Sequence, residues 1–335
     1  MKIKNIRLKD IATKQSKIYI RLDKSLLVNI LKKASKNEKP HRDKKFCGKI
    51  GVYFNKKIKA SPTVIAWIRF NRAIPLSKLL IIKKLSGYSW KSIEENTIGL
   101  KSNLSGREVY ITFPLKIERE IGSIVGHVLG DGSIDKRYNQ VFYSNSNKGL
   151  LEKFSYHMKK VFKIEPRIWA QMTSNFEGKT RWEKRLKEIN ELKKDRNCGL
   201  FYPTICGVLL NIIFDNFSIG KNKKITDKIK KTNKNFKMGL IRAFFDDEGT
   251  VGEKSIRVFQ DRKDILIDIR DFLKEFDIST KEVKKYVKRE KDRYYLDIHR
   301  KSNLIKFRDK IGFTSSKKMN KLKEISVIKN YKNSK

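Results

Sequence analysis

Two acidic-glycine pairs are the residues of this sequence that could perform chemistry together. Asp131 precedes Gly132 and Glu248 precedes Gly249, so the acids at positions 131 and 248 lie 117 residues apart. Two carboxylates held close together repel each other and need a cation between them. Hard divalent ions such as Mg²⁺ take oxygen ligands and can bridge to phosphate. The pairs therefore indicate metal-assisted displacement at phosphorus. The alternative is two exposed acids at helix C-termini, which the helix dipole disfavours.

A stripe of small residues predicts how the two acids meet. Gly122, Gly126 and Gly130 are spaced by four and fall on one face of a helix. In the second stretch the same offsets from the final glycine are taken by Gly239, Ala243 and Asp247. Glycine costs about 1 kcal/mol relative to alanine inside a helix, so the stripe needs a packing reason. We expect the two helices to pack side by side in parallel. The alternative is that each helix makes its own close contact with a sheet.

These two helices open a pattern that occurs twice in the chain. Each copy continues with a β-rich stretch, an amphipathic helix, more strand-like segments and a lysine-rich turn. The opening helices are Ile121–Gly132 and Gly239–Gly249, and the amphipathic ones are Leu150–Phe162 and Ile265–Phe276. Internal repeats of this kind decide a fold more firmly than local propensity. We expect an α+β fold with two pseudo-symmetric αββαββα halves, residues 118–232 and 233–335, packed through their opening helices.

The residues before the repeat form an extension of two predicted parts. Residues 1–74 are a basic region with one helix and one strand, and residues 75–117 resemble a helix-turn-helix module. The predicted elements are a helix at Ser25–Lys33, a strand at Gly51–Phe54, helices starting at Ser77 and Ser89 around a break at Gly87, and a strand at Val109–Phe113. We expect a small α/β or winged-helix-like domain. An ordinary helical hairpin is the alternative.

Charge and composition favour a nucleic-acid partner. The chain has 335 residues, a formal net charge of +43 and 39% hydrophobic residues, so the charge belongs to a folded protein. A polyanion is the natural partner of such a field, although a ribosomal protein could show the same balance. We predict a cytoplasmic, nucleoid-associated protein, because no apolar run reaches the ~20 residues of a membrane span. The cysteines Cys47, Cys198 and Cys206 are expected to be reduced and mostly buried. The four histidines do not cluster, which argues against zinc hydrolases and His-metal nucleases.

The two motifs resemble those of a known family. Ile124–Gly132 (IVGHVLGDG) and Ile241–Gly249 (IRAFFDDEG) are similar to the motif helices of the LAGLIDADG homing endonucleases in their single-chain, two-motif form. The resemblance covers about Glu118 to Ile328. It implies that Asp131 and Glu248 bind catalytic divalent metal, Mg²⁺ or Mn²⁺. It also implies saddle-shaped antiparallel sheets that straddle the DNA major groove while the acids reach scissile phosphates across the minor groove.

The resemblance extends to further candidate residues around the acids. Gly130 and Asp247, which directly precede the two acids, are candidates for the metal site. Asp247 is nevertheless interpreted first as an interface residue, and Asp246 as a cap or hinge contact. His127 departs from the usual apolar residue and is interpreted as a packed helix histidine. Leu129 and Arg242 are further departures. Amides are expected near the metals at Asn145 and Gln260. A lysine that organises water or stabilises phosphate charge is expected at Lys224 and Lys318, with Lys223 and Lys317 as near-equal candidates; nonspecific phosphate contact is the alternative.

DNA-reading side chains are expected on the strands after each motif, where every second residue shares a face. The candidates are Ser133, Asp135, Arg137, Asn139, Tyr143, Thr250, Glu253, Ser255, Arg257, Lys223 and Lys317. The basic segment 221–237 is expected to link the halves along the phosphate backbone. Which strand residues face DNA depends on the pairing register, so the sequence leaves that choice open.

The leading functional hypothesis is a monomeric, site-specific endonuclease for double-stranded DNA with a long, asymmetric target. A second hypothesis is a catalytically inactive LAGLIDADG regulator that binds DNA, and a third is an RNA intron-splicing maturase, so RNA stays an alternative partner. The chain begins with Met and ends Asn-Ser-Lys, so we expect that the residues for intein splicing are absent. We therefore expect a free-standing or intron-encoded protein. No membrane partner is expected.

Overall fold

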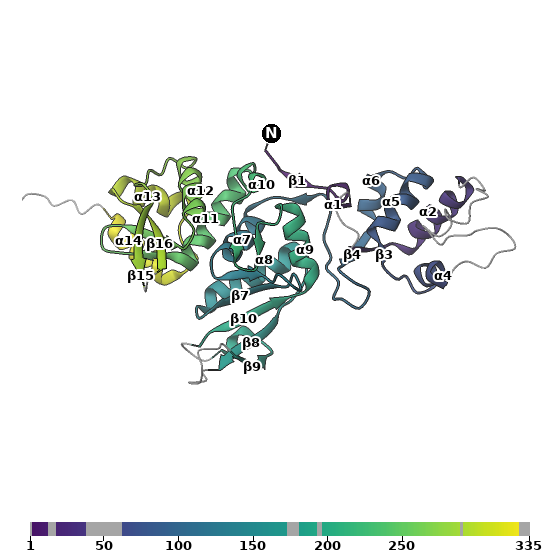
Figure 1. Ribbon diagram of the computed structural model, residues 1–335, viewed down its shortest axis with the longest axis horizontal. Helices are drawn as coiled ribbons and strands as arrows, with labels where there is room; N and C mark the ends of the chain where they lie inside the picture. The colour runs from purple at the N-terminus through teal and green to yellow at the C-terminus, as the bar shows by residue number, and fades with distance from the viewer. Residues whose placement is uncertain are drawn as a thin grey trace, which may run out of the picture.

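The computed structural model describes residues 2–12, 18–37, 62–172, 181–192, 196–288 and 291–327. The chain forms three parts in a row, with the N-terminal part at one end, the first half of the repeat in the middle and the second half at the other end (Figure 1). The strand predicted at Gly51–Phe54 and Cys47 lie outside the described residues. Cys198 and Cys206 are free and buried, as expected. Within the described ranges, no helix is long and apolar enough to cross a membrane.

The two motif helices form the centre of the repeat. They are α7 (Arg119–Leu129) and α11 (Lys234–Glu248), and they pack against each other more extensively than any other pair of described elements. In α7 the residues Ile121 to Leu129 are all buried, as expected for a helix enclosed on every side. Each helix is followed directly by the first strand of its own sheet.

The second half has the predicted order αββαββα with one more helix at its end. Its sheet is antiparallel, in the order β13-β14-β16-β15. After α11 come β13 (Gly249–Val251), β14 (Ile256–Gln260), α12 (Lys263–Lys274), β15 (Lys284–Lys288), β16 (Lys291–Ile298), α13 (Lys301–Lys310) and α14 (Ser316–Ser326).

The first half departs from the predicted pattern by one extra strand in its sheet and by the β11–β12 hairpin and α10 at its end. Its antiparallel sheet has the order β6-β7-β10-β8-β9, so β9 is added at the outer edge where the second sheet stops. After α7 come β6 (Gly132–Ile134), β7 (Val141–Asn145), α8 (Lys148–Phe162), β8 (Arg167–Met172), β9 (Arg181–Leu186), the 3₁₀ turn η1 (Ile189–Glu191), β10 (Cys198–Tyr202), α9 (Thr204–Ile213), β11 (Ser218–Ile219), β12 (Asn222–Lys223) and α10 (Asp227–Lys230).

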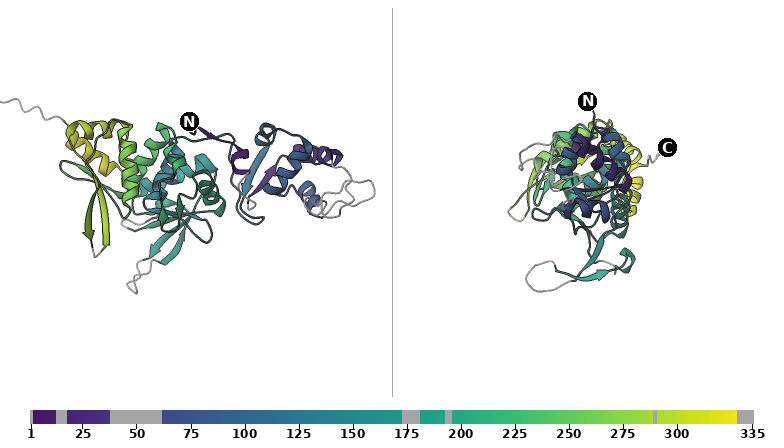
Figure 2. Two further views of the ribbon diagram at one scale, coloured as in Figure 1. Left: turned by 45° about the horizontal axis from the view of Figure 1, so that its top comes forward. Right: turned by 90° about the vertical axis from the view of Figure 1, so that its right-hand side faces the viewer.

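Each sheet buries one face against its helices and leaves the other face open. In the first sheet the fully buried Tyr143 and Leu200 are cross-strand partners, and Ile168 continues the same row. In the second sheet Val258 and Leu296 form the equivalent buried pair. The strands β8–β9 and the hairpin β15–β16 extend to the same side of the molecule, away from the helices (Figure 2). The outer strands of both sheets therefore lie on one side of the molecule.

The N-terminal part is one module. Its antiparallel sheet has the order β3-β2-β4, which joins residues before and after the expected boundary at residue 74, so that boundary falls inside a sheet. The module comprises β2 (Tyr19–Leu22), α2 (Lys24–Asn37), α4 (Pro62–Arg69), β3 (Ile74–Pro75), α5 (Leu76–Ser86), α6 (Trp90–Glu95) and β4 (Thr97–Lys101).

The two helices predicted around Gly87 are present, with two corrections to the predicted elements. Gly87 ends α5 in the left-handed conformation at φ 69°, and Ser89 caps α6 by accepting from the backbone N–H of Ser92 at 3.1 Å. Ser77 is no cap, because α5 already begins at Leu76. The strand expected at Val109–Phe113 is reduced to a single bridge between Val109 and Leu100. The chain between these bridge partners forms a loop at the edge of the module, residues 102–108.

A short N-terminal segment ties this module to the repeat. β1 (Asn5–Ile6) pairs with β5 (Leu115–Lys116), and α1 (Leu8–Ala12) follows β1. The buried Glu94 accepts a hydrogen bond from the backbone N–H of Leu8 at 2.8 Å, which satisfies one orphan donor of α1. Ile3 donates to the carbonyl of Lys231, just before α11.

Candidate active site

The glycine stripe brings the two motif helices into backbone contact. A Cβ atom on Gly122 would lie 2.0 Å from the carbonyl oxygen of Phe236, and one on Gly239 would lie 2.1 Å from that of Arg119. Gly126 has the same relation to Leu240, at 2.3 Å. No larger side chain fits such distances unless the helices move apart. The stripe therefore fixes the parallel pairing that the sequence predicted.

This pairing delivers the two acids to one end of the helix pair, although by different geometry. Glu248 is the last residue of α11, whereas α7 ends at Leu129 and Asp131 lies two residues beyond it. The acids are close enough for the charge of Asp131 to raise the pKa of Glu248. A hollow of about 430 Å³ beside them is lined by Asp131, Asn145, Thr250, Lys317 and Lys318, among others.

Both acids hold their protons more tightly than ordinary carboxyls. Burial raises the pKa of Glu248 to about 7, and the charge of Asp131 adds to this effect. Loss of water on its inner side raises the pKa of Asp131 to about 6 even though its outer side is exposed, and the charge of Asp247 contributes. Nearby lysines oppose both shifts only in part. The site therefore favours a cation that would share the two carboxylates.

The two expected amides, Asn145 and Gln260, stand at equivalent positions of the two sheets but make different contacts. Asn145 donates to the carboxylate of Asp131 at 3.0 Å. Gly132 pairs with Tyr143 and Gly249 pairs with Val258, so Gln260 stands at the position equivalent to Asn145. The side-chain oxygen of Gln260 accepts from the backbone N–H of Asp261 at 2.8 Å. Among the two expected amides, Asn145 is the one placed in contact with an acid.

A lysine caps the end of each motif helix. Lys223 donates to the carbonyls of Leu129, at 3.2 Å, and of Gly130. Lys318 donates to the carbonyls of Phe245, at 3.3 Å, and of Asp246. Burial lowers the pKa of both ammonium groups, and the surrounding acids counteract this. Both lysines thus satisfy orphan carbonyls and bring positive charge to the site.

The placement reverses the expected order of the first pair of lysines. Lys224 has an exposed side chain, and its backbone N–H bonds to Phe217. Lys223 is the last residue of the two-residue strand β12 and directly precedes Lys224, and successive side chains of an extended chain point to opposite faces. In the second half Lys318 is at the helix end as expected, while Lys317 is exposed at the rim of the hollow.

A buried polar cluster crosses between the halves directly behind Asp131. The Asp247 carboxylate lies 3.0 Å from Nδ1 of His127, accepts from the Tyr143 hydroxyl at 2.8 Å and faces the backbone N–H of Asp131 at 3.3 Å. The side chains of His127 and Asp247 are 1% and 0% exposed. Burial alone would lower the pKa of His127, but the negative charge of Asp247 and the bond to it raise that pKa overall. Asp247 has this reach because Gly130 leaves room for it, since a Cβ atom at position 130 would lie 2.7 Å from its side chain.

Asp246 and Arg242, on the second motif helix, both contact the segment that leads into α14. The Asp246 carboxylate accepts three backbone hydrogen bonds, two from Thr314 and one from Ser315, and so anchors the turn that carries Lys318. Arg242 donates to the carbonyl of Ile311. Both oxygens of Asp247 are engaged with His127, Tyr143 and Asp131, so its carboxylate is not placed as a metal ligand. Asp246 is thus the expected cap, and Asp247 the expected interface residue.

The donors around the acids fit a hard divalent ion. The described residues contain no cluster of three or more His, Cys, Asp and Glu side chains able to hold a metal. A metal here would therefore take the carboxylates of Asp131 and Glu248, with the remaining oxygens coming from elsewhere, as is usual for Mg²⁺. Two carboxyls that lie close together and have raised pKa values are suited to that role.

The predicted DNA-reading residues divide into three groups in the structure. Ser133, Thr250 and Arg257 lie on the open faces, where Thr250 is paired with Arg257. Tyr143 does not: it is fully buried against Asp247, which corrects its assignment as a base reader. Lys223 lies in β12 and Lys317 in α14, and the remaining candidates lie in turns. Asp135 accepts from the N–H groups of Arg137 and Tyr138, Asn139 has φ 52°, and Glu253 and Ser255 belong to the β13–β14 turn.

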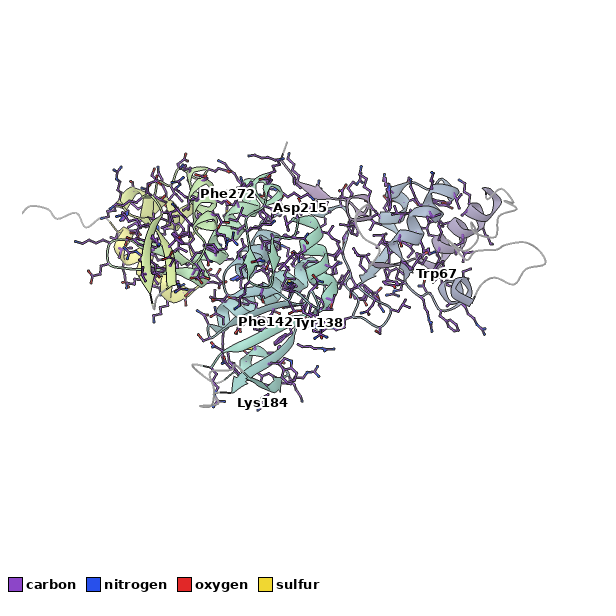
Figure 3. The ribbon with its side chains drawn as sticks, viewed as in Figure 1. Trp67, Tyr138, Phe142, Lys184, Asp215 and Phe272 are labelled. Atoms are coloured by element: carbon purple, nitrogen blue, oxygen red, sulfur yellow. The ribbon has the colours of Figure 1, made fainter. Side chains whose placement is uncertain are left out.

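Sequence reasoning missed the aromatic side chains of the open faces. The first sheet displays Phe142, Phe201 and Trp169 there, and the second displays Phe259, Tyr286 and Tyr295. Phe142 lies on the first sheet, away from its outer end, where Lys184 is found (Figure 3). The signal was present in the strands as the residues that alternate with the buried ones, for example Phe142 beside Tyr143.

Residues 235–312 match the model of the LAGLIDADG-like domain family. The second half of the chain therefore carries a LAGLIDADG-like domain. The matched residues contain Glu248, Gln260 and the whole sheet of the second half, so this family identity coincides with the repeat unit seen in the fold.

Two relatives align over most of this chain. One is the Replication factor C small subunit of Methanocaldococcus jannaschii, 27% identical over 253 residues, which make up 74% of this chain and 12% of that protein. The other is the DNA-directed RNA polymerase subunit Rpo1C of the same organism, 26% identical over 215 residues, 63% of this chain and 21% of that protein. This chain therefore spans only a small part of either relative.

Solved structures with some likeness include a homing endonuclease and a protein with a LAGLIDADG domain. One is I-DmoI in complex with DNA and Mn, with a TM-score of 0.41, 14% identity and coverage of 58% of this chain and 97% of that one. Another is full-length DUF199/WhiA from Thermatoga maritima, with a TM-score of 0.38, 14% identity and coverage of 62% of this chain and 58% of that one.

Proposed function

We propose that this LAGLIDADG protein is a site-specific endonuclease for double-stranded DNA. The observation that carries the proposal is the pair Asp131 and Glu248, held at one end of two contacting helices with raised pKa values. A protein that only binds DNA has no need for two facing acids, each of which destabilises the other when ionised. The net charge of +43 supports a polyanionic partner.

The residues around the acids support a division of labour. A bound Mg²⁺ or Mn²⁺ would supply electrophilic stabilisation of a scissile phosphate. Asp131 and Glu248 would hold that ion, and Asn145 would orient the Asp131 carboxylate through its 3.0 Å bond. Lys223 and Lys318 place positive charge beside the same point, where it can stabilise developing negative charge on the phosphate.

The test is cleavage of a randomised duplex library with Mg²⁺, followed by sequencing of the cut ends. We expect wild type to enrich one long site, and Asp131→Asn and Glu248→Gln to bind the selected duplex but to lose at least a thousandfold in cleavage rate, because each removes a metal ligand. A wild type that binds the duplex but never cuts it would support the inactive regulator. Preferred binding of a folded intron RNA would support the maturase.

A further inference from the structure

The open faces of the two sheets carry an unusual chemistry for a DNA-binding surface. In the first sheet the row Ser133, Phe142, Phe201 and Arg167 crosses four strands, and the next row contains Trp169 opposite Gly199. The rings of Phe142 and Phe201 lie with their centroids 4.8 Å apart. All three aromatic side chains are half-buried, so each still presents part of its ring on this face.

The second sheet repeats this chemistry with different residues. Phe259, Tyr286 and Tyr295 form a closed cluster, with ring centroids 5.7 to 6.4 Å apart. The arginines on this face are already paired: Arg257 makes two bonds to Asp297, at 2.5 and 3.0 Å, and Arg293 bonds to Asp261 at 2.6 Å. An arginine held by a carboxylate is not available to bind guanine, so the aromatic rings are the groups left to contact bases.

From this arrangement we infer that the open faces select thymine, through contact between the aromatic rings and the C5-methyl groups in the major groove. The inference rests on the proposed DNA-binding function. In that groove the methyl group is the apolar feature that distinguishes thymine from the other bases, and aromatic side chains can contact it. The phenylalanines offer no hydrogen bond, so the methyl is the feature they can recognise.

Ring orientation favours a duplex over a single strand. Base stacking on a protein needs open ring faces. In the second cluster Phe259 and Tyr295 each pack against Tyr286 in an edge-to-face manner, and the guanidinium of Arg257 lies 4.5 Å over the ring of Tyr295. These contacts occupy ring faces. Contact with methyl groups needs only ring edges, which the open side of the cluster still offers.

Flanking cations fit a duplex that lies along these faces. Arg167 stands opposite Phe201, Arg185 opposite Trp169, and Lys284 opposite Tyr295, all with exposed side chains. Arg107, on the edge loop of the N-terminal module, helps to line a hollow of about 330 Å³ together with Arg167, Trp169 and Phe201. Apolar rings at the centre of a face with cations around them match thymine methyl groups that lie between two phosphate backbones.

The two halves place their rings at different distances from the acids. Phe142 precedes Asn145 by three residues, whereas Phe259 precedes the equivalent Gln260 by one. Two residues of a strand span about 6.7 Å, which equals the rise of about two base pairs. A thymine contacted by Phe142 would therefore lie about two base pairs farther from the cleavage centre than one contacted by Phe259.

The experiment uses the full chain and a duplex selected from a randomised library, with EDTA present so that nothing is cut. Each thymine of the selected duplex is replaced in turn by deoxyuridine, which lacks only the methyl group, and the Kd is measured. Wild type is expected to lose about fourfold in affinity for each methyl that a ring contacts. Uridine at positions outside the contacted set should leave the Kd unchanged.

Three variants assign the effect to the rings. Phe142→Ser is expected to remove the sensitivity to uridine in the first half-site only, and Phe259→Ser in the second only. Tyr156→Ser removes an exposed aromatic ring from α8, on the helical side, and should preserve the full pattern. Circular dichroism confirms that each variant is folded.

The outcomes separate this inference from the function on which it rests. Equal affinity for thymine and uracil duplexes, with duplex binding intact, overturns the methyl contact and leaves the endonuclease proposal standing. Failure to bind any duplex overturns both. A preference for single-stranded nucleic acid that Phe142→Ser weakens also overturns the inference, in favour of base stacking.

Discussion

The two halves bring one acid and one lysine to the same place by different routes. In the second half α11 continues through Glu248, and Lys318 comes from the first turn of α14, held by Asp246. In the first half α7 stops at Leu129, and Lys223 comes from the β11–β12 hairpin. Leu129 occupies the place of Asp246 and cannot anchor a turn. The position of the groups at the helix ends is therefore kept while the structures that supply them differ.

The two halves are most alike at the contact between α7 and α11. We expect Gly122→Val and Gly239→Val each to lower the free energy of unfolding by about 3 kcal/mol or more, because either side chain would overlap backbone of the other helix. Urea unfolding measures the loss. Gly149→Ala is the matched control, since its Cβ meets nothing closer than 3.4 Å and should be neutral or slightly stabilising. Equal effects at all three glycines would contradict the packing role of the stripe.

The two halves differ most at the buried cluster of His127, Tyr143 and Asp247. Removing its side chains tests whether the stability of one half depends on the other. His127→Leu is expected to cost about 3 kcal/mol, because it leaves the buried carboxylate of Asp247 without its charged partner. The double variant with Asp247→Ala should be more stable than the two single losses predict. A double-mutant cycle on thermal unfolding gives the coupling. Simple additivity would show that the two side chains act separately.

Neighbouring lysines offer a test with nearly identical chemistry. Lys223→Met is expected to reduce the cleavage rate of the selected duplex about a hundredfold, because it removes charge beside the acids. Lys224→Met should change it little, because that side chain points away and is exposed. Lys318→Met and Lys317→Met should show the same contrast in the second half. A larger effect of Lys224→Met would restore the order that the sequence suggested.

The smallest expected effect is the pH dependence of stability that the two acids cause. The folded pKa values are about 6 for Asp131 and about 7 for Glu248, against ordinary values of 3.8 and 4.5. In the unfolded chain these groups therefore ionise first as the pH rises. Their contribution to stability is present below about pH 4 and is lost as the pH rises through the folded pKa values.

This sign gives a measurable stability profile. The metal-free protein should lose stability between about pH 4 and 7, and the double variant Asp131→Asn, Glu248→Gln should lack that part of the profile. Mg²⁺ at pH 7.5 should raise the Tm of wild type and leave the variant unchanged. Identical profiles for the two proteins would argue that the acids do not face each other. Comparison of the two single variants shows which acid contributes more.

The sequence could predict the parts of this fold that occur in both halves. It could not predict features that depend on strand register and on the direction of single side chains. The glycine spacing at 122, 126 and 130 was enough to predict the helix pairing, because only close packing explains it. The added strand β9 carries no signal in the repeat. Tyr143 and Phe142 are neighbours in one strand, and the register that buries the first and opens the second follows from tertiary pairing. Lys223 and Lys224 are indistinguishable in sequence because only the direction of a two-residue strand separates them.

The backbone contact between the motif helices also shapes how such a protein can evolve. The closest points of contact are between glycines of one helix and carbonyl oxygens of the other. A glycine at such a point cannot be replaced through small compensating changes nearby, because its neighbour is backbone. The open faces of the sheets lie outside this constraint, and equivalent positions already differ there, with Phe142 in one half and Arg257 in the other. Mutation of the open faces could therefore redirect the proposed endonuclease to new recognition sequences, while the centre proposed to cut them is inherited unchanged.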